Sequence, residues 1–265
     1  MSRALRYSGL STRFVIPKRG FRLRFYPSNS SAQQWVDPYH ENDAQHGQRE
    51  ETFFRRYLRP GDVVVDVGAN FGLTALAAFS VVGRSGQVHA FEPHPRIYSF
   101  LEGNIALNGA QDVVKAYNLA IGEQPGEVFL TDERADDQNC VSDDATGLRV
   151  PMSTLNDAAG DLPPIALLKI DVEGYEQFVL RGATHTLERT ACIYFESCDE
   201  KFAQYGYSLA EIVDLLAPHG FEVRRLGGDG GQTTAIAAGD GSTELEDLVA
   251  VSDLEYLHQR LNGST

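Results

Sequence analysis

Short apolar runs alternate with amphipathic segments along most of this chain, from residue 48 to residue 251. The apolar runs are too short for helices and are rich in Val and Ile, which favours buried strands. The segments between them carry apolar residues at helical spacing, and several end at Gly or Asn-Gly. The predicted strands are 62–67, 87–91, 113–119, 165–172, 191–195, 221–226 and 248–251. The predicted helices are 48–58, 71–82, 95–107, 175–187 and 208–218.

This alternation predicts an α/β fold with one open, mostly parallel sheet covered by helices on both faces. The last two predicted strands have no strong helix between them, so we expect an antiparallel hairpin at one sheet edge. A further strand pair is expected at 127–131 and 149–153, around a polar excursion. Ligands of such sheets bind beyond the carboxyl ends of the strands, so the functional search narrows to the residues that follow each strand.

Charge is unevenly spread along the 265 residues, whose formal net charge is −14. Residues 1–36 contain seven Arg or Lys and no acid, which leaves 16 bases and 37 acids for residues 37–265. We therefore divide the chain into a basic N-terminal arm and extension, 1–47, and a main domain, 48–265. The extension contains an alternating pattern at 20–26 that is typical of a half-buried strand.

Composition excludes several classes of function. The acidic body cannot neutralise a phosphate backbone, so we expect no nucleic-acid partner. No apolar stretch approaches the roughly 20 residues that span a bilayer, so no integral membrane segment is expected. The three cysteines form no framework and no C-x-x-C pair, which favours a reducing, cytoplasmic location. The Arg- and Ser-rich start also fits an organellar transit peptide, the less favoured interpretation. The sequence carries no signal of oligomeric state.

The first candidate site is the turn after the strand at 62–67. Gly68 and Gly72 allow a ligand to approach the backbone closely, and the following helix offers free N–H groups. Asp66, at the strand end, could face a cationic group. A ligand with an amine, a carboxylate and a ribose would use all of these features, although a tight strand-helix connection alone would also explain the glycines.

Glu92 lies at the end of the next predicted strand, where a carboxylate can accept hydrogen bonds from both hydroxyls of a ribose. A solvated strand-end acid is the alternative. NAD-dependent oxidoreductases also use an acid here, but their G-x-G-x-x-G pattern is missing. Asp66 would repel a pyrophosphate and suits the amino group of a methionine-like moiety. The pair therefore favours S-adenosylmethionine over NAD.

A third site follows in Lys169, Asp171 and Glu173, which would project to one side of a strand and converge at its carboxyl end. Burial of unpaired charges is costly, so we expect Lys169 to pair with a carboxylate. The cluster could simply support the turn. In the functional interpretation, Asp171 faces the transferred methyl group and the acceptor, while Glu173 orders the loop.

Three segments together resemble the hallmark motifs of the FkbM family of S-adenosylmethionine-dependent methyltransferases. They are DVGANFG at 66–72, Glu92-Pro93, and LKIDVEGYE at 168–176. The resemblance covers about 48–251, with one departure at Asn156, where the family has Asp. It implies a Rossmann-like methyltransferase domain with a seven-stranded sheet of order 3-2-1-4-5-7-6, strand 7 antiparallel. It also implies O-methyl transfer to a hydroxyl of a small molecule, sugar or glycan.

The resemblance assigns the methionine end of the cofactor to the first turn, the ribose to Glu92 and the adenine to the residues after the third strand. The complete predicted cofactor-binding set is Asp66, Gly68, Ala69, Asn70, Gly72, Glu92, Pro93, Ala120, Ile121 and Asp171.

Methyl transfer to oxygen also needs a group that removes the acceptor's proton. The catalytic candidates are Lys169, Asp171, Glu173 and His94, although His94 could instead only cap the next helix. Asp171 and Glu196 end neighbouring predicted strands and could bind Mg²⁺, which we keep as an alternative to a carboxylate base. The other functional alternatives are N-methylation, NAD-dependent oxidoreduction and a catalytically inert cofactor-binding module.

Overall fold

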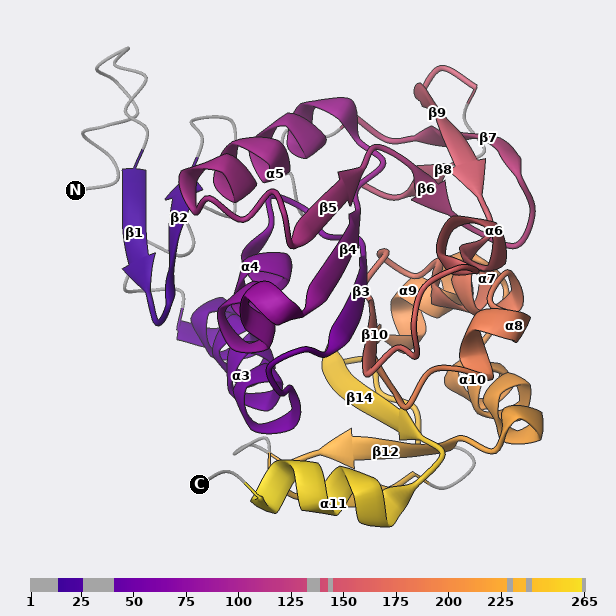
Figure 1. Cartoon of the computed structure of the whole chain (residues 1–265). Helices are drawn as coiled ribbons and strands as arrows, with labels where there is room; N and C mark the ends of the chain where they lie inside the picture. The colour runs from indigo at the N-terminus through magenta and orange to yellow at the C-terminus, as the bar shows by residue number, and fades with distance from the viewer. Residues whose placement is uncertain are drawn as a thin grey trace.

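A central sheet of eight strands organises the molecule in the computed structural model (Figure 1). The structure describes residues 14–25, 41–132, 139–142, 145–227, 231–236 and 240–263. The sheet consists of β3 (Val63–Val67), β4 (Gln87–Phe91), β5 (Val114–Tyr117), β10 (Leu167–Ile170), β11 (Cys192–Ser197), β12 (Glu222–Leu226), β13 (Thr233–Ala235) and β14 (Glu246–Val251). Their order across the sheet is β13-β12-β14-β11-β10-β3-β4-β5.

The five strands from β5 to β11 run parallel, and β14 runs antiparallel to both of its neighbours, β11 and β12. All five residues of β3 are buried, as expected for a β-branched strand covered on both faces. The prediction of a mostly parallel sheet is confirmed. The expected number of seven strands is wrong, because β13 pairs with β12 and adds an eighth strand at the edge.

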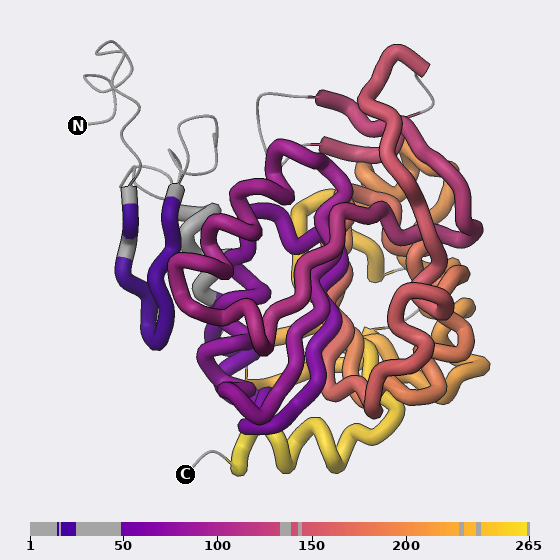
Figure 2. The backbone as a smooth tube through the Cα atoms, turned by 45° about the horizontal axis from the view of Figure 1, so that its top comes forward, coloured from indigo at the N-terminus to yellow at the C-terminus, as the bar shows by residue number. Residues whose placement is uncertain are grey.

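Helices cover both faces of the sheet (Figure 2). The sheet separates two large hydrophobic cores, one beneath each layer of helices. One face carries α3 (Glu41–Tyr57), α4 (Leu73–Val82), α5 (Pro95–Leu107) and α11 (Leu254–Asn262). The other carries α6 (Leu155–Ala159), α7 (Glu176–Arg181), α8 (Thr184–Leu187), α9 (Asp199–Gln204) and α10 (Leu209–Leu216). Val64 belongs to the first core and Val65 to the second, because successive strand residues point to opposite faces.

The helix predicted at 175–187 is instead two short helices, α7 and α8. They are separated at Gly182, which lies against the backbone of Gly122. A Cβ atom added to Gly182 would come within 2.1 Å of the Gly122 carbonyl oxygen. This close backbone crossing bends the chain between the two helices, and hydrophobic periodicity carries no signal of it.

An N-terminal hairpin packs against α5. Its strands are β1 (Phe14–Lys18) and β2 (Phe21–Phe25), and Phe21 and Leu23 are buried in the first core. Asn104 and Asn108, one turn apart on α5, act as hydrogen-bonding partners for the free edge of β2. Their side-chain oxygens accept from the backbone N–H groups of Arg24 and Arg22, each at 2.7 Å. The strand predicted at 20–26 is confirmed, while the domain boundary after residue 47 stays a prediction.

A second, smaller sheet lies beside the carboxyl ends of β4 and β5. It contains β6 (Ala120–Ile121), β7 (Gly126–Leu130), β8 (Val141–Ser142) and β9 (Leu148–Ser153), in the order β6-β9-β7-β8. β7 and β9 pair antiparallel over five residues, which confirms the strand pair expected around the polar excursion. This sheet supplies one wall of the site described below.

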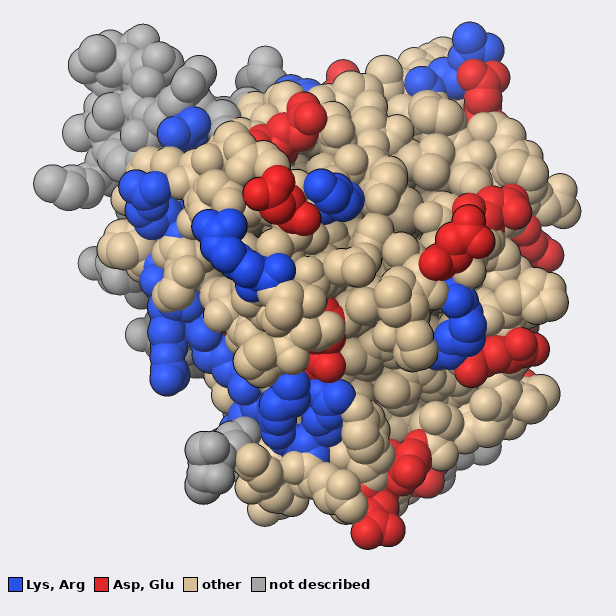
Figure 3. All heavy atoms as spheres, viewed as in Figure 1, with Lys and Arg blue, Asp and Glu red and all other residues tan. Residues whose placement is uncertain are grey.

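The surface reflects the uneven charge of the sequence. In Figure 3, Lys and Arg gather over the β1–β2 hairpin and α3, whereas many of the acids lie on the opposite side of that view. Residues 1–13 and 26–40, which make up most of the basic arm and part of the extension, lie outside the described residues. No described helix combines the length and the apolar character that crossing a membrane requires.

Candidate active site

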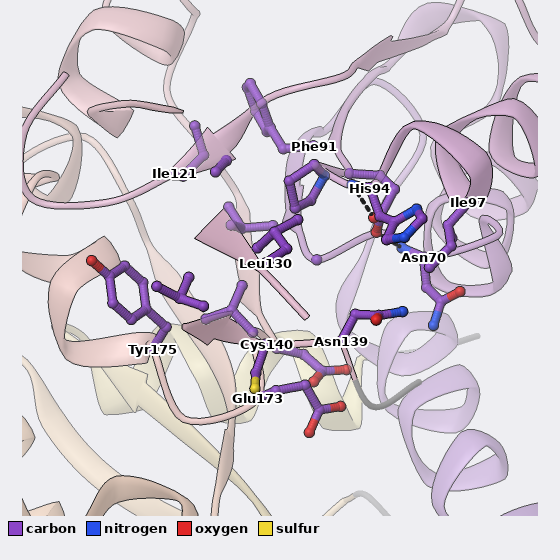
Figure 4. A pocket seen from close by; sticks show the side chains of 18 of the residues that line it. Asn70, Phe91, His94, Ile97, Ile121, Leu130, Asn139, Cys140, Glu173 and Tyr175 are labelled. Carbon is purple, nitrogen blue, oxygen red and sulfur yellow. Dashed lines mark hydrogen bonds between the residues drawn. The ribbon is translucent and has the colours of Figure 1, made fainter. Parts of the chain in front are cut away.

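A pocket of about 700 Å³ opens at the carboxyl ends of β3, β4 and β10 (Figure 4). Most of its walls are residues that directly follow the strands, as the sheet topology predicts. The lining residues are Val67, Gly68, Asn70, Phe91, Glu92, Pro93, His94, Ile97, Leu119, Ala120, Ile121, Leu130, Asn139, Cys140, Val141, Asp171, Val172, Glu173 and Tyr175.

The turn after β3 needs glycine at Gly68 for two reasons. Its φ angle is +80°, in the left-handed region that disfavours other residues. A Cβ atom there would also lie 1.8 Å from the carbonyl oxygen of Asp171. The turns that follow β3 and β10 are therefore in direct backbone contact. The N–H groups of Gly68 and Ala69 both donate to the Phe91 carbonyl oxygen at 3.0 Å, which fixes this turn against the end of β4.

Glu92 holds the loops after β3 and β4 together. Its Oε2 accepts from the Asn70 N–H at 3.0 Å, and its Oε1 accepts from the His94 N–H at 2.8 Å. Burial raises the pKa of Glu92 to about 7, although these two backbone hydrogen bonds favour the ionised form. The carboxyl group is therefore fixed in orientation at the pocket wall and titrates near neutral pH.

His94 is both a helix cap and a pocket residue. Its Nδ1 accepts from the Arg96 N–H at 3.3 Å, which caps α5. This assigns the ring proton to Nε2, which lies 3.2 Å from Asp132 Oδ1. Burial lowers the pKa of His94, so the imidazole is mainly neutral at pH 7.

Asp66 does not line the pocket, contrary to the prediction that it contacts the cofactor. It is only 1% exposed and accepts a hydrogen bond of 2.6 Å from the Thr74 hydroxyl. Its Oδ1 lies 3.6 Å from Lys169 Nζ, which is 3.0 Å from Asp171 Oδ2. Burial raises the pKa of Asp66, but Lys169 and Thr74 oppose this shift. Asp66 therefore orients the lysine that holds Asp171.

Three other predicted residues also lie behind the pocket. Ala69 is buried in the first core, and Gly72 caps α4 with its α carbon facing Leu101. Lys169 is 2% exposed and reaches the site through Asp171 Oδ2, at 3.0 Å, and the Gly68 carbonyl oxygen, at 3.4 Å. Burial lowers the pKa of Lys169, but Asp171 and Asp66 raise it more, so the ammonium stays charged.

The prediction that Lys169, Asp171 and Glu173 project from one face of a strand is wrong, because β10 ends at Ile170. The chain then turns sharply, with Glu173 at φ +57° and Gly174 at φ +97°. Glu176 holds this turn: its Oε1 accepts from the N–H groups of Val172 and Gly174, at 3.0 and 3.3 Å. Glu176 was not among the predicted site residues, although it closes the most specific sequence motif.

Asp171, Glu173 and Glu196 nevertheless converge. One carboxylate oxygen from each lies within 4.8 Å of the others, the only such group of possible metal ligands among the described residues. Lys201 Nζ lies 2.6 Å from Glu173 and 2.7 Å from Glu196, so an ammonium group already bridges two of the three. Burial and the neighbouring Asp171 raise the pKa of Glu196 well above its ordinary value.

The pocket has an apolar side that the sequence indicated only in part. Ala120 and Ile121, predicted to flank adenine, lie there with Phe91 and Leu130 (Figure 4). Residues 139–141 of the polar excursion complete the wall, and the Tyr205 hydroxyl donates to the Val141 carbonyl oxygen at 2.8 Å. Such an irregular segment has no periodicity from which its position could be predicted.

Comparison with known proteins agrees with this geometry. The family described as "Methyltransferase FkbM domain" matches residues 66–223, which include every residue lining the pocket. The chain is 26% identical over 179 residues to the 2-O-methyltransferase NoeI of Sinorhizobium fredii, covering 60% of this chain and 72% of NoeI. It is 30% identical over 203 residues to the 31-O-demethyl-FK506 methyltransferase FkbM of Streptomyces tacrolimicus, covering 63% of this chain and 75% of that protein.

Among solved structures, a SAM-dependent methyltransferase from Aquifex aeolicus is similar with a TM-score of 0.49 and 14% identity. The alignment covers 84% of this chain and 98% of that one. The extent of the family match and the identity to its members decide the assignment. The chain belongs to the FkbM family and is an S-adenosylmethionine-dependent methyltransferase.

Proposed function

We propose that the protein transfers the methyl group of S-adenosylmethionine to a hydroxyl of a small molecule or glycan. The main supporting observation is Glu92, whose carboxyl group is held at the pocket wall by the N–H groups of Asn70 and His94. This geometry suits a pair of ribose hydroxyls. The names of both relatives specify transfer to oxygen, which favours O-methylation over N-methylation.

The described residues fit the cofactor in three ways. Gly68 and Asn70 line the pocket, so the turn after β3 faces the space in which the ligand would lie. Glu92 offers acceptors for the ribose, and the wall at Phe91, Ala120 and Ile121 suits an adenine ring. We propose Gly68, Asn70, Glu92, Pro93, Ala120, Ile121 and Asp171 as the contacts, with Asp66, Ala69 and Gly72 supporting the turn.

When bound, the cofactor supplies an electrophilic methyl group. An aliphatic hydroxyl is a weak nucleophile, so a group that accepts its proton accelerates the transfer. We propose Asp171 for this role, because it lines the pocket and Lys169 Nζ holds its carboxylate in place at 3.0 Å. Glu173 orders the loop through Lys201, while neutral His94 shapes the wall beside Glu92.

A divalent ion at Asp171, Glu173 and Glu196 is the alternative to this arrangement. We favour a metal-independent reaction because the Lys201 ammonium already bridges two of the three carboxylates, those of Glu173 and Glu196. Activity that is lost on chelation and restored by Mg²⁺ would reverse this preference.

The decisive experiment combines binding and turnover. Isothermal titration calorimetry should show binding of S-adenosylhomocysteine to the wild-type protein and about tenfold or greater weakening in Glu92→Ala, because two hydrogen bonds to a charged group are lost. Glu102→Ala, an exposed carboxylate on the neighbouring α5, is the control. Incubation of labelled S-adenosylmethionine with cell extracts, followed by mass analysis, then identifies the acceptor and separates O- from N-methylation. Absence of calorimetric binding would overturn the proposal.

A further inference from the structure

The β1–β2 hairpin turns one side to the core and the other to solvent. Phe21 and Leu23 of β2 are buried in the first core, where β2 contacts α4 and α5. Successive strand residues point to opposite sides, so Arg22 and Arg24 point away from the core. Arg22 is exposed and Arg24 is half-buried. The hairpin is therefore amphipathic, and its outward side is basic.

β1 adds apolar residues to that outward side. Val15 lies opposite Arg24 and Pro17 lies opposite Arg22, and directly opposite residues of an antiparallel pair share one side of the sheet. Pro17 is exposed, and Val15, at 45%, is the one large hydrophobic residue that is exposed in the described part of the chain. We call these four residues, with Arg19 at the exposed turn, the hairpin face.

The surroundings of the hairpin face are also basic. Residues 14–25 contain four bases and no acid, and residues 1–13 add three Arg and no acid. α3 lies against the hairpin: Arg55 donates to the Arg19 carbonyl oxygen, and Lys18 Nζ lies 3.7 Å from Glu51. Figure 3 shows that Lys and Arg gather over these elements, while many of the acids lie on the opposite side of that view. The charge of the molecule is thus polarised between two sides.

We propose that the hairpin face docks on the surface of an anionic lipid bilayer, with its arginines at the lipid phosphates and Val15 among the headgroups. Each Lys or Arg held near such a surface strengthens binding about fivefold. The attraction falls off within a Debye length, about 8 Å at physiological ionic strength. The acids on the opposite side of the molecule are therefore screened from the bilayer and oppose docking only weakly.

Two features favour a bilayer over a nucleic acid. Apolar side chains gain from burial at a lipid interface, whereas a phosphate backbone offers Val15 no such contact. A bilayer also meets one side of the molecule, while a long nucleic acid would pass the acidic remainder, which has 16 bases and 37 acids over residues 37–265. No described residue of β1, β2 or α3 lines the cofactor pocket, so docking does not use its walls.

Vesicle cosedimentation of the full chain tests the docking. Vesicles of equimolar phosphatidylserine and phosphatidylcholine should bind at least about tenfold more tightly than vesicles of phosphatidylcholine alone, because several arginines contribute. The binding should be lost when the NaCl concentration is raised from about 0.1 M to about 1 M, since the Debye length falls from about 10 Å to about 3 Å. No cofactor is present, so the result is independent of the proposed function.

Charge-matched variants locate the contact. Arg19→Gln/Arg22→Gln should weaken binding to the anionic vesicles about 30-fold, the product of two single-charge effects. Arg149→Gln/Arg181→Gln removes the same charge from exposed ion pairs on β9 and α7, outside the hairpin face, and should change binding less than about twofold. Val15→Ser should weaken binding about fivefold without altering its salt dependence, because it removes apolar surface and no charge.

The outcomes are distinct. Circular dichroism and melting curves verify folding, and Arg19→Gln alone, with about a fivefold loss, carries the test if the double variant does not fold. Equal binding to the two kinds of vesicle, or unchanged binding in the hairpin variants, would overturn the proposal. Tighter binding to duplex DNA than to the anionic vesicles would also overturn it, as would a dimer that Arg19→Gln/Arg22→Gln abolishes.

Discussion

Glu92 shows how one carboxyl group can set the pH dependence of cofactor binding. Its pKa is raised to about 7, and only the ionised form accepts hydrogen bonds from two ribose hydroxyls through both oxygens. The ionised fraction rises with pH, so the affinity for S-adenosylhomocysteine should increase about tenfold from pH 6 to pH 8. Calorimetry at pH 6, 7 and 8 measures this. Glu92→Gln should bind more weakly and without this pH dependence; a persistent slope in the variant would assign it to another group.

Lys201 is expected to stabilise the site as a fixed counter-ion. Lys201→Ala would leave Glu173 and Glu196 side by side without their shared ammonium group, at a cost of about 1–3 kcal/mol for this partly buried pair. The cost should be larger at pH 8 than at pH 5, because the pKa of Glu196 is raised and its protonation at low pH removes one of the ion pairs even in the wild type. Urea unfolding at both pH values measures it. Arg181→Ala, which breaks an exposed ion pair with Glu123, is the control and should change little.

Side-chain direction at a strand end limited prediction at the residue scale. Glu92 and Asn70 were placed at the pocket by motif and position, and the structure puts them there. Asp66 was placed with them, but its side chain points to Lys169 and Thr74 behind the turn. The sequence shows that an acid lies near the end of β3, but it does not show that this acid faces Lys169, because Lys169 lies about a hundred residues further along the chain.

The close backbone contact between the turns that follow β3 and β10 makes Gly68 the critical glycine at the scale of elements. Gly68→Ala meets two penalties, a left-handed φ and a Cβ position 1.8 Å from the Asp171 carbonyl oxygen. Gly220 has nearly the same φ, +81°, but a Cβ there has nothing within 4 Å. Gly220→Ala should therefore cost only about 1–2 kcal/mol, and Gly68→Ala at least about 3 kcal/mol. Urea unfolding provides both values.

Calorimetry separates the effect of Gly68→Ala on the site from its effect on stability. Because the variant must displace Asp171 or the turn after β3, its affinity for S-adenosylhomocysteine should fall while that of Gly220→Ala is unchanged. Equal costs for the two variants would show that φ alone, rather than the close approach of the strands, requires glycine at residue 68.

Element prediction succeeded where hydrophobic periodicity was strong and failed where the backbone approached another segment. The helices at 95–107 and 208–218 were expected, and the Ser208–Glu211 capping box is present in the structure. The division of α7 from α8 depends on contact with Gly122, and the end of β10 depends on contact with Gly68. Both contacts join distant parts of the chain, so local sequence patterns cannot reveal them.

The whole molecule combines two large hydrophobic cores that share one sheet, and the proposed cofactor pocket lies at the carboxyl edge of that sheet. Its walls come from β3, β4 and β10, from the small sheet and from the loop that Glu176 holds. The sequence predicted a site at this edge, because the candidate motifs directly follow the predicted strands and the carboxyl ends of parallel strands lie at one edge of a sheet. It did not show that Glu50 and Asp247 line one cavity, because these two residues are nearly two hundred positions apart and follow no motif.

A cofactor bound across this edge should stabilise the molecule as one unit. A ligand that binds only the folded state adds RT ln(1 + [L]/Kd), so S-adenosylhomocysteine at about 100 times its Kd should raise the free energy of unfolding by about 2.7 kcal/mol. Because the central strands serve both cores, we expect one urea transition, monitored by both far-UV and near-UV circular dichroism, to shift to higher urea concentration. Two transitions, of which only one responded to the ligand, would instead show that the two sides of the sheet unfold independently.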